Sequence, residues 1–343
     1  MAKKRKNESE QPELPIPGAK APENADPKTP ANGEPKKKPD ANGNGHTEIV
    51  AENVPAALVH RPFSPGKIEL ALHKRVNTSF LEYASYVIRD RAIPHLADGV
   101  KPVQRRILYV LHTMDDGKFI KVASVTGETM KYHPHGNASI DDAIVVLANK
   151  RYLIEGQGNF GNIFTGDPAA APRYIECRLT QLAREELFND QITDFIPTYD
   201  GRKQEPVTLP CKLPLTLMLG AEGIAVGLSA RLLPHNFPEL LQAQIAILKK
   251  ESFKCLPDFM TGGLMDARDY QDGKGSVTVR AKIKVKDEST VVIKEIPPTT
   301  TTDSLITSIE DAAAKGKLKV KSVNDFTSEE VEIEVKCHAG VDA

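Results

Sequence analysis

The residues with the clearest chemical potential are an adjacent pair, Arg173 and Tyr174. A tyrosine hydroxyl can act as a nucleophile that forms a covalent intermediate. The planar guanidinium of arginine offers paired donors to phosphate oxygens. The pair follows a glycine-rich segment, 156–162, and a run of three alanines at 169–171. Attack of a phenolate on a phosphodiester is therefore the chemistry to consider, although an isolated Arg-Tyr dipeptide is more often structural.

A second set of polar residues lies upstream, in the segment Tyr132-His133-Pro134-His135-Gly136. Histidines can transfer protons or donate hydrogen bonds to a charged transition state. Basic residues stand before this segment at the start of a helix pattern whose other face is apolar. They are Lys101, Arg105 and Arg106. Together with the Arg-Tyr pair, these residue types could hold a phosphate and stabilise its charge.

Five segments, taken together, resemble one family. They read DGVKPVQRR at 98–106, YHPHG at 132–136, EGQGNFG at 155–161, AAAPRYIE at 169–176 and GIAVG at 223–227. Their order within residues 68–343 is similar to that in the breakage-rejoining A subunits of bacterial type IIA DNA topoisomerases, which are gyrase and topoisomerase IV. No single segment would suffice for this interpretation.

The resemblance implies a role for several residues. Tyr174 would be the nucleophile that forms a 5′-phosphotyrosine, and Arg173, His133 and Lys101 would stabilise the scissile phosphate. Ile224 would insert between base pairs as an apolar wedge that bends the duplex. The residues expected to contact DNA are Arg91, His135, Arg105, Arg106 and Ile224.

The sequence offers no site for the cofactors that this reaction uses. Phosphoryl transfer of this kind needs Mg²⁺, but the acidic residues form no suitable cluster. Asp141 and Asp142 are adjacent on an expected helix and therefore point in different directions. A GxxxxGK[ST] motif for ATP is also missing from the sequence. We therefore expect a B subunit to bind both Mg²⁺ and ATP, in an A2B2 complex that contains a homodimer of this chain and acts on double-stranded DNA.

The composition of the chain indicates the cellular compartment to which it is suited. The chain has 343 residues, a net charge of −1 and four cysteines without a CxxC pair, which argues against a zinc site or a disulfide framework. This cysteine usage fits a reducing cytoplasm, where the resemblance implies association with the nucleoid. No signal peptide is apparent, and the most apolar stretch, 213–230, is interrupted by Glu222, glycines and proline. We expect no membrane association.

The expected fold class is α+β and multidomain. Residues 1–66 are poor in apolar side chains and are expected to form a disordered tail. Residues 67–205 would form an N-terminal arm and a winged helix-turn-helix DNA-cleavage domain, and residues 206–343 an incomplete αβ tower domain. The coiled coil of the family's exit gate is not present in the chain, so we expect a fragment of a longer protein.

The patterns also predict individual elements. Helices are expected at 78–91, from 102, at 122–130, from an N-cap at Asn137, at 179–189, and at 303–314 with Asp303 as its cap. Strands are expected at 151–154, 276–284, 290–296 and 331–336.

Three alternatives stay open. Gln104 and the segments 299–305 and 315–317 favour topoisomerase IV over gyrase within the resemblance. A winged-helix DNA-binding protein without catalysis would not need Arg173, Tyr174, His133 and Lys101 together. A metal-dependent nuclease built on His133 and His135 lacks nearby carboxylates.

Overall fold

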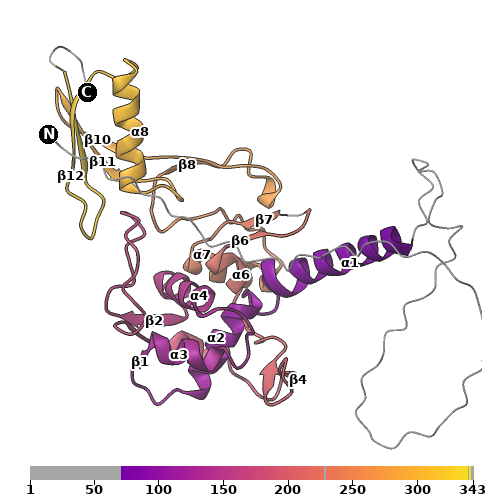
Figure 1. Cartoon of the computed structure of the whole chain (residues 1–343). Coiled ribbons are helices and arrows are strands. Elements are labelled where there is room, and N and C mark those ends of the chain that lie inside the picture. The colour runs from indigo at the N-terminus through magenta and orange to yellow at the C-terminus, as the bar shows by residue number, and fades with distance from the viewer. Residues whose placement is uncertain (1–70, 228, 339, 341–343) are drawn as a thin grey trace, which may run out of the picture. The chain divides into compact units, whose positions relative to one another are not determined.

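The computed structural model describes residues 71–343, except 228, 339 and 341–343 (Figure 1). The chain divides into two compact units, 1–64 and 65–343, and the second is described below. The expected disordered tail, 1–66, lies outside the described residues, so that prediction stays untested.

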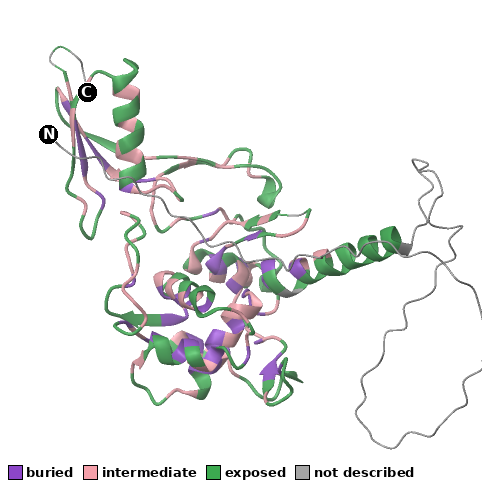
Figure 2. Cartoon of the chain, viewed as in Figure 1, coloured by how far each residue is buried: buried purple, intermediate pink, exposed green. Residues whose placement is uncertain are grey.

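The first described element is a helix, α1 (Ala71–Val87), that continues into a π-helical turn, η2 (Ile88–Ala92). It begins at least seven residues before the expected start at Thr78. Pro94 follows, and the residue before a proline is biased away from helical backbone. The apolar stripe of α1, including Phe80 and Tyr83, is exposed along most of its length (Figure 2). The periodicity therefore predicted the helix correctly, but the stripe is not part of this chain's core.

A group of three helices and a small sheet follows. The helices are α2 (Pro102–Thr113), α3 (Val122–Thr129) and α4 (Asn137–Asn149). The antiparallel sheet has the order β1-β3-β2, with β1 (Ile120–Lys121), β3 (Glu176–Leu179) and β2 (Ile154–Gln157). Three boundaries differ from expectation. Strand β2 covers Ile154–Gln157 and not 151–154. The N-cap of α4 is Gly136 rather than Asn137, and Leu179 pairs with Ile154 in the sheet, so that α5 (Gln181–Glu186) is shorter than expected.

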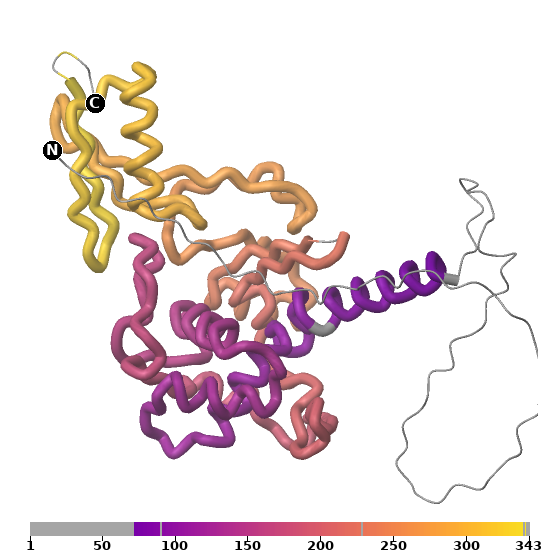
Figure 3. The backbone as a smooth tube through the Cα atoms, in the orientation of Figure 1, coloured from indigo at the N-terminus to yellow at the C-terminus, as the bar shows by residue number. Residues whose placement is uncertain are grey.

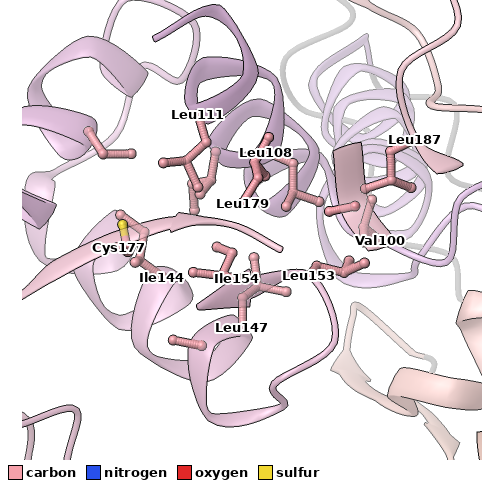
Figure 4. Close-up of a cluster of buried hydrophobic side chains, with 14 of the residues drawn as sticks. Val100, Leu108, Leu111, Ile144, Leu147, Leu153, Ile154, Cys177, Leu179 and Leu187 are labelled. Carbon is pink, nitrogen blue, oxygen red and sulfur yellow. The ribbon is translucent and has the colours of Figure 1, made fainter. Parts of the chain in front are cut away.

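The core of this group is a cluster of buried aliphatic side chains from the helices and the sheet (Figure 4). Leu108 and Leu111 of α2 meet Ile144 and Leu147 of α4 and Ile154 of β2 there. The same cluster extends to α6 (Leu215–Leu219) and α7 (Phe237–Lys249). The hydrophobic core thus continues past residue 206, where the tower domain was expected to begin.

Short hairpins connect to this core. They are β4 (Phe195–Pro197) with β5 (Gln204–Pro206), and β6 (Ala221–Ile224) with β7 (Ser229–Leu232). A further pair, β8 (Leu264–Asp266) with β9 (Thr278–Arg280), flanks the short 3₁₀ turn η3 (Gln271–Gly273). The apolar stretch 213–230 supplies α6, β6 and the first half of β7. No helix among residues 71–343, outside the gaps, is long and apolar enough to cross a bilayer.

The path of the C-terminal part of the chain through a second sheet can be followed in Figure 3. This sheet has its own apolar cluster. Its strands are β10 (Lys282–Asp287), β11 (Thr290–Glu295), β12 (Val320–Asp325) and β13 (Ile333–Cys337), in the order β10-β11-β13-β12. Helix α8 (Thr302–Ala314) packs on this sheet through Leu305, Ile306 and Ile309. Its N-cap is Thr301, in a capping box with Ser304, and not Asp303 as expected. Strand β12 was not expected from the sequence.

Candidate active site

Most of the basic residues singled out above surround one cavity. This cavity of about 280 Å³ lies where the end of α1, η2, the start of α2 and the α3–α4 loop meet the tip of β6. Of the expected site residues, it is lined by Arg91, Lys101, Arg106, His133, His135 and Ile224. The structure therefore brings together six residues that are spread over more than 130 positions of the chain. Tyr86 and Ser139 also line the cavity, and no sequence pattern marked either of them.

Lys101 stands at the N-terminal end of α2. Its backbone N–H donates to Oε1 of Gln104 at 2.9 Å, which satisfies a backbone donor at the start of the helix. Its Nζ donates to the carbonyl oxygen of Glu222 in β6 at 2.7 Å. Burial lowers the pKa of Lys101, and the charge of Glu222 raises it in part. Two of its three ammonium donors remain for a ligand in the cavity.

Arg106 is oriented by a buried carboxylate, Glu205 of β5. Its Nε and Nη2 donate to the two carboxylate oxygens at 2.5 and 2.9 Å, a bidentate pair. The remaining nitrogen, Nη1, lies 2.8 Å from Nδ1 of His133. Glu205 is therefore a residue of the site that the sequence analysis missed. It lies 99 positions from Arg106, and no local pattern marks it.

His133 is held as a neutral imidazole. A guanidinium can only donate, so Nδ1 of His133 must accept from Arg106 and the ring proton must lie on Nε2. Burial lowers the pKa of His133 to about 4, and the charges of His135, Arg106 and Arg91 act in the same direction. Near neutral pH this side chain therefore offers an N–H donor and not a positive charge.

His135 stacks on His133, with ring centroids 4.1 Å apart and planes at 16°. Its Nδ1 is buried and has no hydrogen-bond partner among the residues that the structure describes. The backbone N–H of His135 donates to the carbonyl of His133 at 2.8 Å, which closes the turn before α4. The histidine pair is thus fixed by the backbone on one side and by Arg106 on the other.

Arg105, which was expected to contact DNA, does not line this cavity. Its side chain is 9% exposed and that of its partner Asp98 is fully buried. Nε and Nη2 of Arg105 donate to the carboxylate of Asp98 at 2.6 and 3.1 Å. Asp98 also accepts from the backbone N–H of Leu209 at 2.9 Å. Arg105 therefore stabilises the interior, while its neighbour Arg106 reaches the cavity.

Tyr174 and Arg173 do not line the cavity. Tyr174 is 64% exposed, and Cζ of Arg173 lies 4.5 Å from the centre of its ring. The backbone on either side is well held, because the Tyr174 N–H donates to the carbonyl of Ala171 at 2.9 Å and the next residue, Ile175, is buried. A fixed backbone thus presents the phenol and the guanidinium together.

The glycine-rich segment supports this presentation. Gly161 has φ +80°, and a Cβ there would lie 2.5 Å from the carbonyl oxygen of Asp167, so only glycine allows this close approach. Asn149, the last residue of α4, donates from Nδ2 to the carbonyl of Phe160 at 3.0 Å. The carbonyl of Asn159 accepts from the backbone N–H of Ala170 at 2.9 Å. The loop therefore joins the end of α4 to the alanine run that precedes Arg173.

Ile224 stands at the end of β6 and is 80% exposed. Its neighbour Gly223 packs so closely on η2 that a Cβ would lie 2.2 Å from the carbonyl oxygen of Ala92. A bare-sequence interpretation would place Ile224 in the core, but the structure places it at the surface. An exposed isoleucine next to a basic cavity has the position that an apolar wedge needs.

The described residues do not form a metal site of their own. No group of three His, Cys, Asp or Glu side chains converges within 71–343, gaps aside. Asp141 accepts a hydrogen bond from Oγ1 of Thr126 at 2.6 Å, which ties α4 to α3. The donors in the cavity are cationic or neutral N–H groups, which suit phosphate oxygens and not Mg²⁺.

The family model and the similar proteins indicate the same family. The family model for the A subunit of DNA gyrase/topoisomerase IV matches residues 91–343. The A subunit of DNA topoisomerase 4 from Borreliella burgdorferi is 57% identical over 263 residues, which are 77% of this chain and 42% of that protein. Its counterpart of the same name in Neisseria gonorrhoeae is 40% identical over 284 residues, which are 74% of this chain and 37% of that protein. The A subunit of DNA gyrase from Mycolicibacterium smegmatis is 38% identical over 296 residues, which are 77% of this chain and 35% of that protein.

This chain spans about two fifths of the length of these relatives. The matched region includes the Arg-Tyr pair, the second sheet and every lining residue of the cavity except Tyr86. The chain therefore belongs to the family of DNA gyrase and topoisomerase IV A subunits.

Proposed function

We propose that this chain is the DNA breakage-rejoining part of a type IIA topoisomerase. The observation that carries the proposal is the exposed Tyr174 ring with the guanidinium of Arg173 over it, on a backbone fixed at Ala171 and Ile175. The phenolate oxygen of Tyr174 would attack a backbone phosphorus. The new O–P bond makes a 5′-phosphotyrosine, the P–O3′ bond breaks, and the 3′ oxygen leaves with a proton as a hydroxyl.

The bond that forms and the bond that breaks are both phosphate esters. The reaction therefore needs no redox step, and the 3′-hydroxyl can reverse it after a second duplex has passed. Arg173 would hold non-bridging oxygens of the phosphate and stabilise the charge that develops on them. An arginine beside the nucleophile would thus supply positive charge at a position that is otherwise open to solvent.

The cavity residues would bind the DNA backbone near the break. Lys101 and Arg91 offer positive charge, and His133 offers its neutral Nε2–H. Arg106 would act mainly through His133, because two of its nitrogens are already occupied by Glu205. His135 would help to hold the His133 ring in position by stacking on it.

Arg173 and Tyr174 stand outside this cavity in the single chain. A homodimer on one duplex would present two such pairs and two such cavities, as a double-strand break requires. We therefore propose a homodimer of this chain within an A2B2 complex.

We assign α2, α3 and α4 with the β1-β3-β2 sheet to a winged helix-turn-helix. Residues 67–205 would form the arm and this domain, and 206–343 the tower, with α6 and α7 packed on the first core. Ile224 would enter the base stack as a wedge. Unstacking one step costs a few kcal/mol, which the contacts of the bent duplex with basic residues would offset.

Mg²⁺ and ATP would be bound by a B subunit, since the donors here suit phosphate and not Mg²⁺. The higher identity to a topoisomerase 4 A subunit, 57% compared with 38% for a gyrase A subunit, favours topoisomerase IV. DNA gyrase is the alternative. We expect a cytoplasmic, nucleoid-associated enzyme.

The test is a covalent-trapping assay with the complete protein, a B subunit, Mg²⁺ and supercoiled plasmid. Detergent quenching and protease digestion should give linear DNA with peptide on its 5′ ends, and Tyr174→Phe should give none. Plasmid binding without any adduct in the wild type would instead favour a winged-helix DNA-binding protein that lacks catalysis.

A further inference from the structure

Lys150, the C-cap of α4, is directed at the base of the β6–β7 hairpin. Its Nζ donates to the carbonyl oxygen of Leu219 at 2.6 Å and to that of Gly220 at 3.0 Å. Leu219 is the last residue of α6 and Gly220 is its C-cap. Carbonyls at the end of a helix lack partners within that helix and carry partial negative charge. The ammonium therefore satisfies two acceptors at the point where the chain turns from α6 into β6.

The hairpin itself has few means of holding its position. It consists of two strands of four residues, with Ile224 exposed at one end, and an isolated two-stranded hairpin is marginally stable in water. Besides Lys150, the contacts that hold β6 among the described residues include Lys101 Nζ on the carbonyl of Glu222 and the close packing of Gly223 on Ala92. Lysines at the ends of two different helices thus hold carbonyls of one short segment.

The chemistry of Lys150 is unusual for a surface lysine. Burial lowers its pKa to about 8, and the charge of Lys101 acts in the same direction. No acidic side chain pairs with it in the described part of the chain. Burying an unpaired ammonium is costly, so its location is favourable only while both carbonyls are within reach. A displacement of the turn from α6 into β6 would therefore leave Lys150 without compensation.

Helix α4 connects this contact to the cavity. The turn that contains His133 and His135 leads into its N-terminus, and Lys150 directly follows its C-terminus. Because its backbone hydrogen bonds make it stiff, this helix of 13 residues keeps its two ends at a fixed distance and orientation. The location of the hairpin is thereby set relative to the histidine pair.

We infer that Lys150 is a positioning residue for DNA bending, which holds the base of the β6–β7 hairpin on α4 so that Ile224 enters the duplex at a fixed place relative to His133 and His135. The inference rests on the proposed role of Ile224 as a wedge. It adds a residue that touches neither DNA nor the scissile phosphate. Its effect is to make the wedge effective once DNA is bound.

The experiment uses the complete protein, its partner B subunit, and a duplex labelled with a fluorophore at each end. Lys150→Met keeps the length of the side chain and removes its donors. We expect less end-to-end energy transfer, which reports less bending, and about a tenfold loss of cleavage, which corresponds to roughly one charged hydrogen bond. Affinity for DNA should fall much less. Lys249→Met is the matched control, because Lys249 is also a lysine at a helix end but is exposed.

A double variant separates positioning from general stability. Because Lys150 acts through Ile224, Lys150→Met added to Ile224→Ala should cause no further loss of bending or cleavage. Multiplying effects in the double variant, or normal bending by Lys150→Met alone, would overturn the inference.

The experiments distinguish an error in the proposed wedge role of Ile224 from an error in the proposed role of Lys150 as the anchor of the hairpin. If Ile224→Ala bends DNA normally, the proposed wedge is wrong. The rate of amide hydrogen exchange in the β6–β7 hairpin, measured without DNA, then tests by itself whether Lys150 holds the hairpin in place. Faster exchange in Lys150→Met than in Lys249→Met supports the anchor, and equal exchange refutes it.

Discussion

Replacing Arg105 by methionine should destabilise the protein without removing a DNA contact. The side chain lies in the interior and donates twice to the carboxylate of Asp98 and once to the carbonyl of Val100. Methionine has a similar length but no donors. The substitution leaves the Asp98 carboxylate buried with two backbone N–H donors, from Val100 and Leu209.

The expected magnitude follows from these contacts. Removing one partner of a buried ion pair costs about 3–5 kcal/mol. The two backbone donors that Asp98 retains favour the lower end, about 3 kcal/mol, which is roughly a hundredfold change in the folding equilibrium. For a domain of this size, we expect a decrease in Tm of about 6–12 °C.

Two measurements test this reasoning together. Thermal unfolding gives the loss of stability, and Arg184→Met serves as a control because the Arg184–Asp115 pair is partly exposed and should cost less than about 1 kcal/mol. The salt dependence of DNA binding gives the number of phosphate contacts. Its slope should be unchanged in Arg105→Met but fall by about 1 in Lys101→Met.

The opposite pattern would refute the assignment of Arg105 to the interior. If Arg105→Met keeps its Tm and reduces the slope of the salt dependence, the guanidinium contacts a phosphate. A double variant, Asp98→Leu with Arg105→Met, provides a further check. It should recover much of the lost stability, because replacing both partners of a buried pair by apolar residues is often neutral.

Two further predictions concern the cavity. Glu205→Gln weakens the bidentate pair that orients Arg106, because a neutral acceptor binds a guanidinium about half as strongly. Cleavage in the trapping assay should therefore fall about tenfold. Unchanged cleavage with intact DNA binding would show that Arg106 does not need Glu205 to orient it. His133 has its pKa lowered to about 4 in the folded state, compared with about 6.5 when unfolded, so its neutral form contributes stability that is present above pH 6.5 and is lost as the pH falls through 4. Acidification from pH 7 to 4 should therefore lower the Tm of the wild type more than that of His133→Gln, and parallel curves for the two proteins would contradict this.

Sequence patterns were sufficient for local features. Helix α3 and the start of α2 follow from apolar spacing and from Pro102, whose fixed φ and missing donor suit the first turn of a helix. Strand β11 lies where alternating side chains indicated it, whereas the single strand expected at 276–284 is divided between β9 and the first half of β10. These features depend on neighbours in the chain, and local propensity is therefore enough to predict them.

Capping and short strands were less predictable. Thr301 and Asp303 are both acceptable N-caps by residue type, and only the backbone geometry decides that Thr301 accepts from Ser304. Strand β12 has a mixed pattern, and it is defined by its pairing with β13. The residue types of β12 alone do not indicate this pairing.

The residue types of the site were determined by the sequence: a tyrosine beside an arginine, two histidines around a proline, and basic residues at the start of a helix. Their roles were decided by tertiary structure. Arg105 and Arg106 are neighbours on one helix, yet one pairs with Asp98 in the interior and the other reaches His133. The difference depends on acidic partners at positions 98 and 205. A helix sets the angle between adjacent side chains, but only the elements packed around it decide which of them is buried.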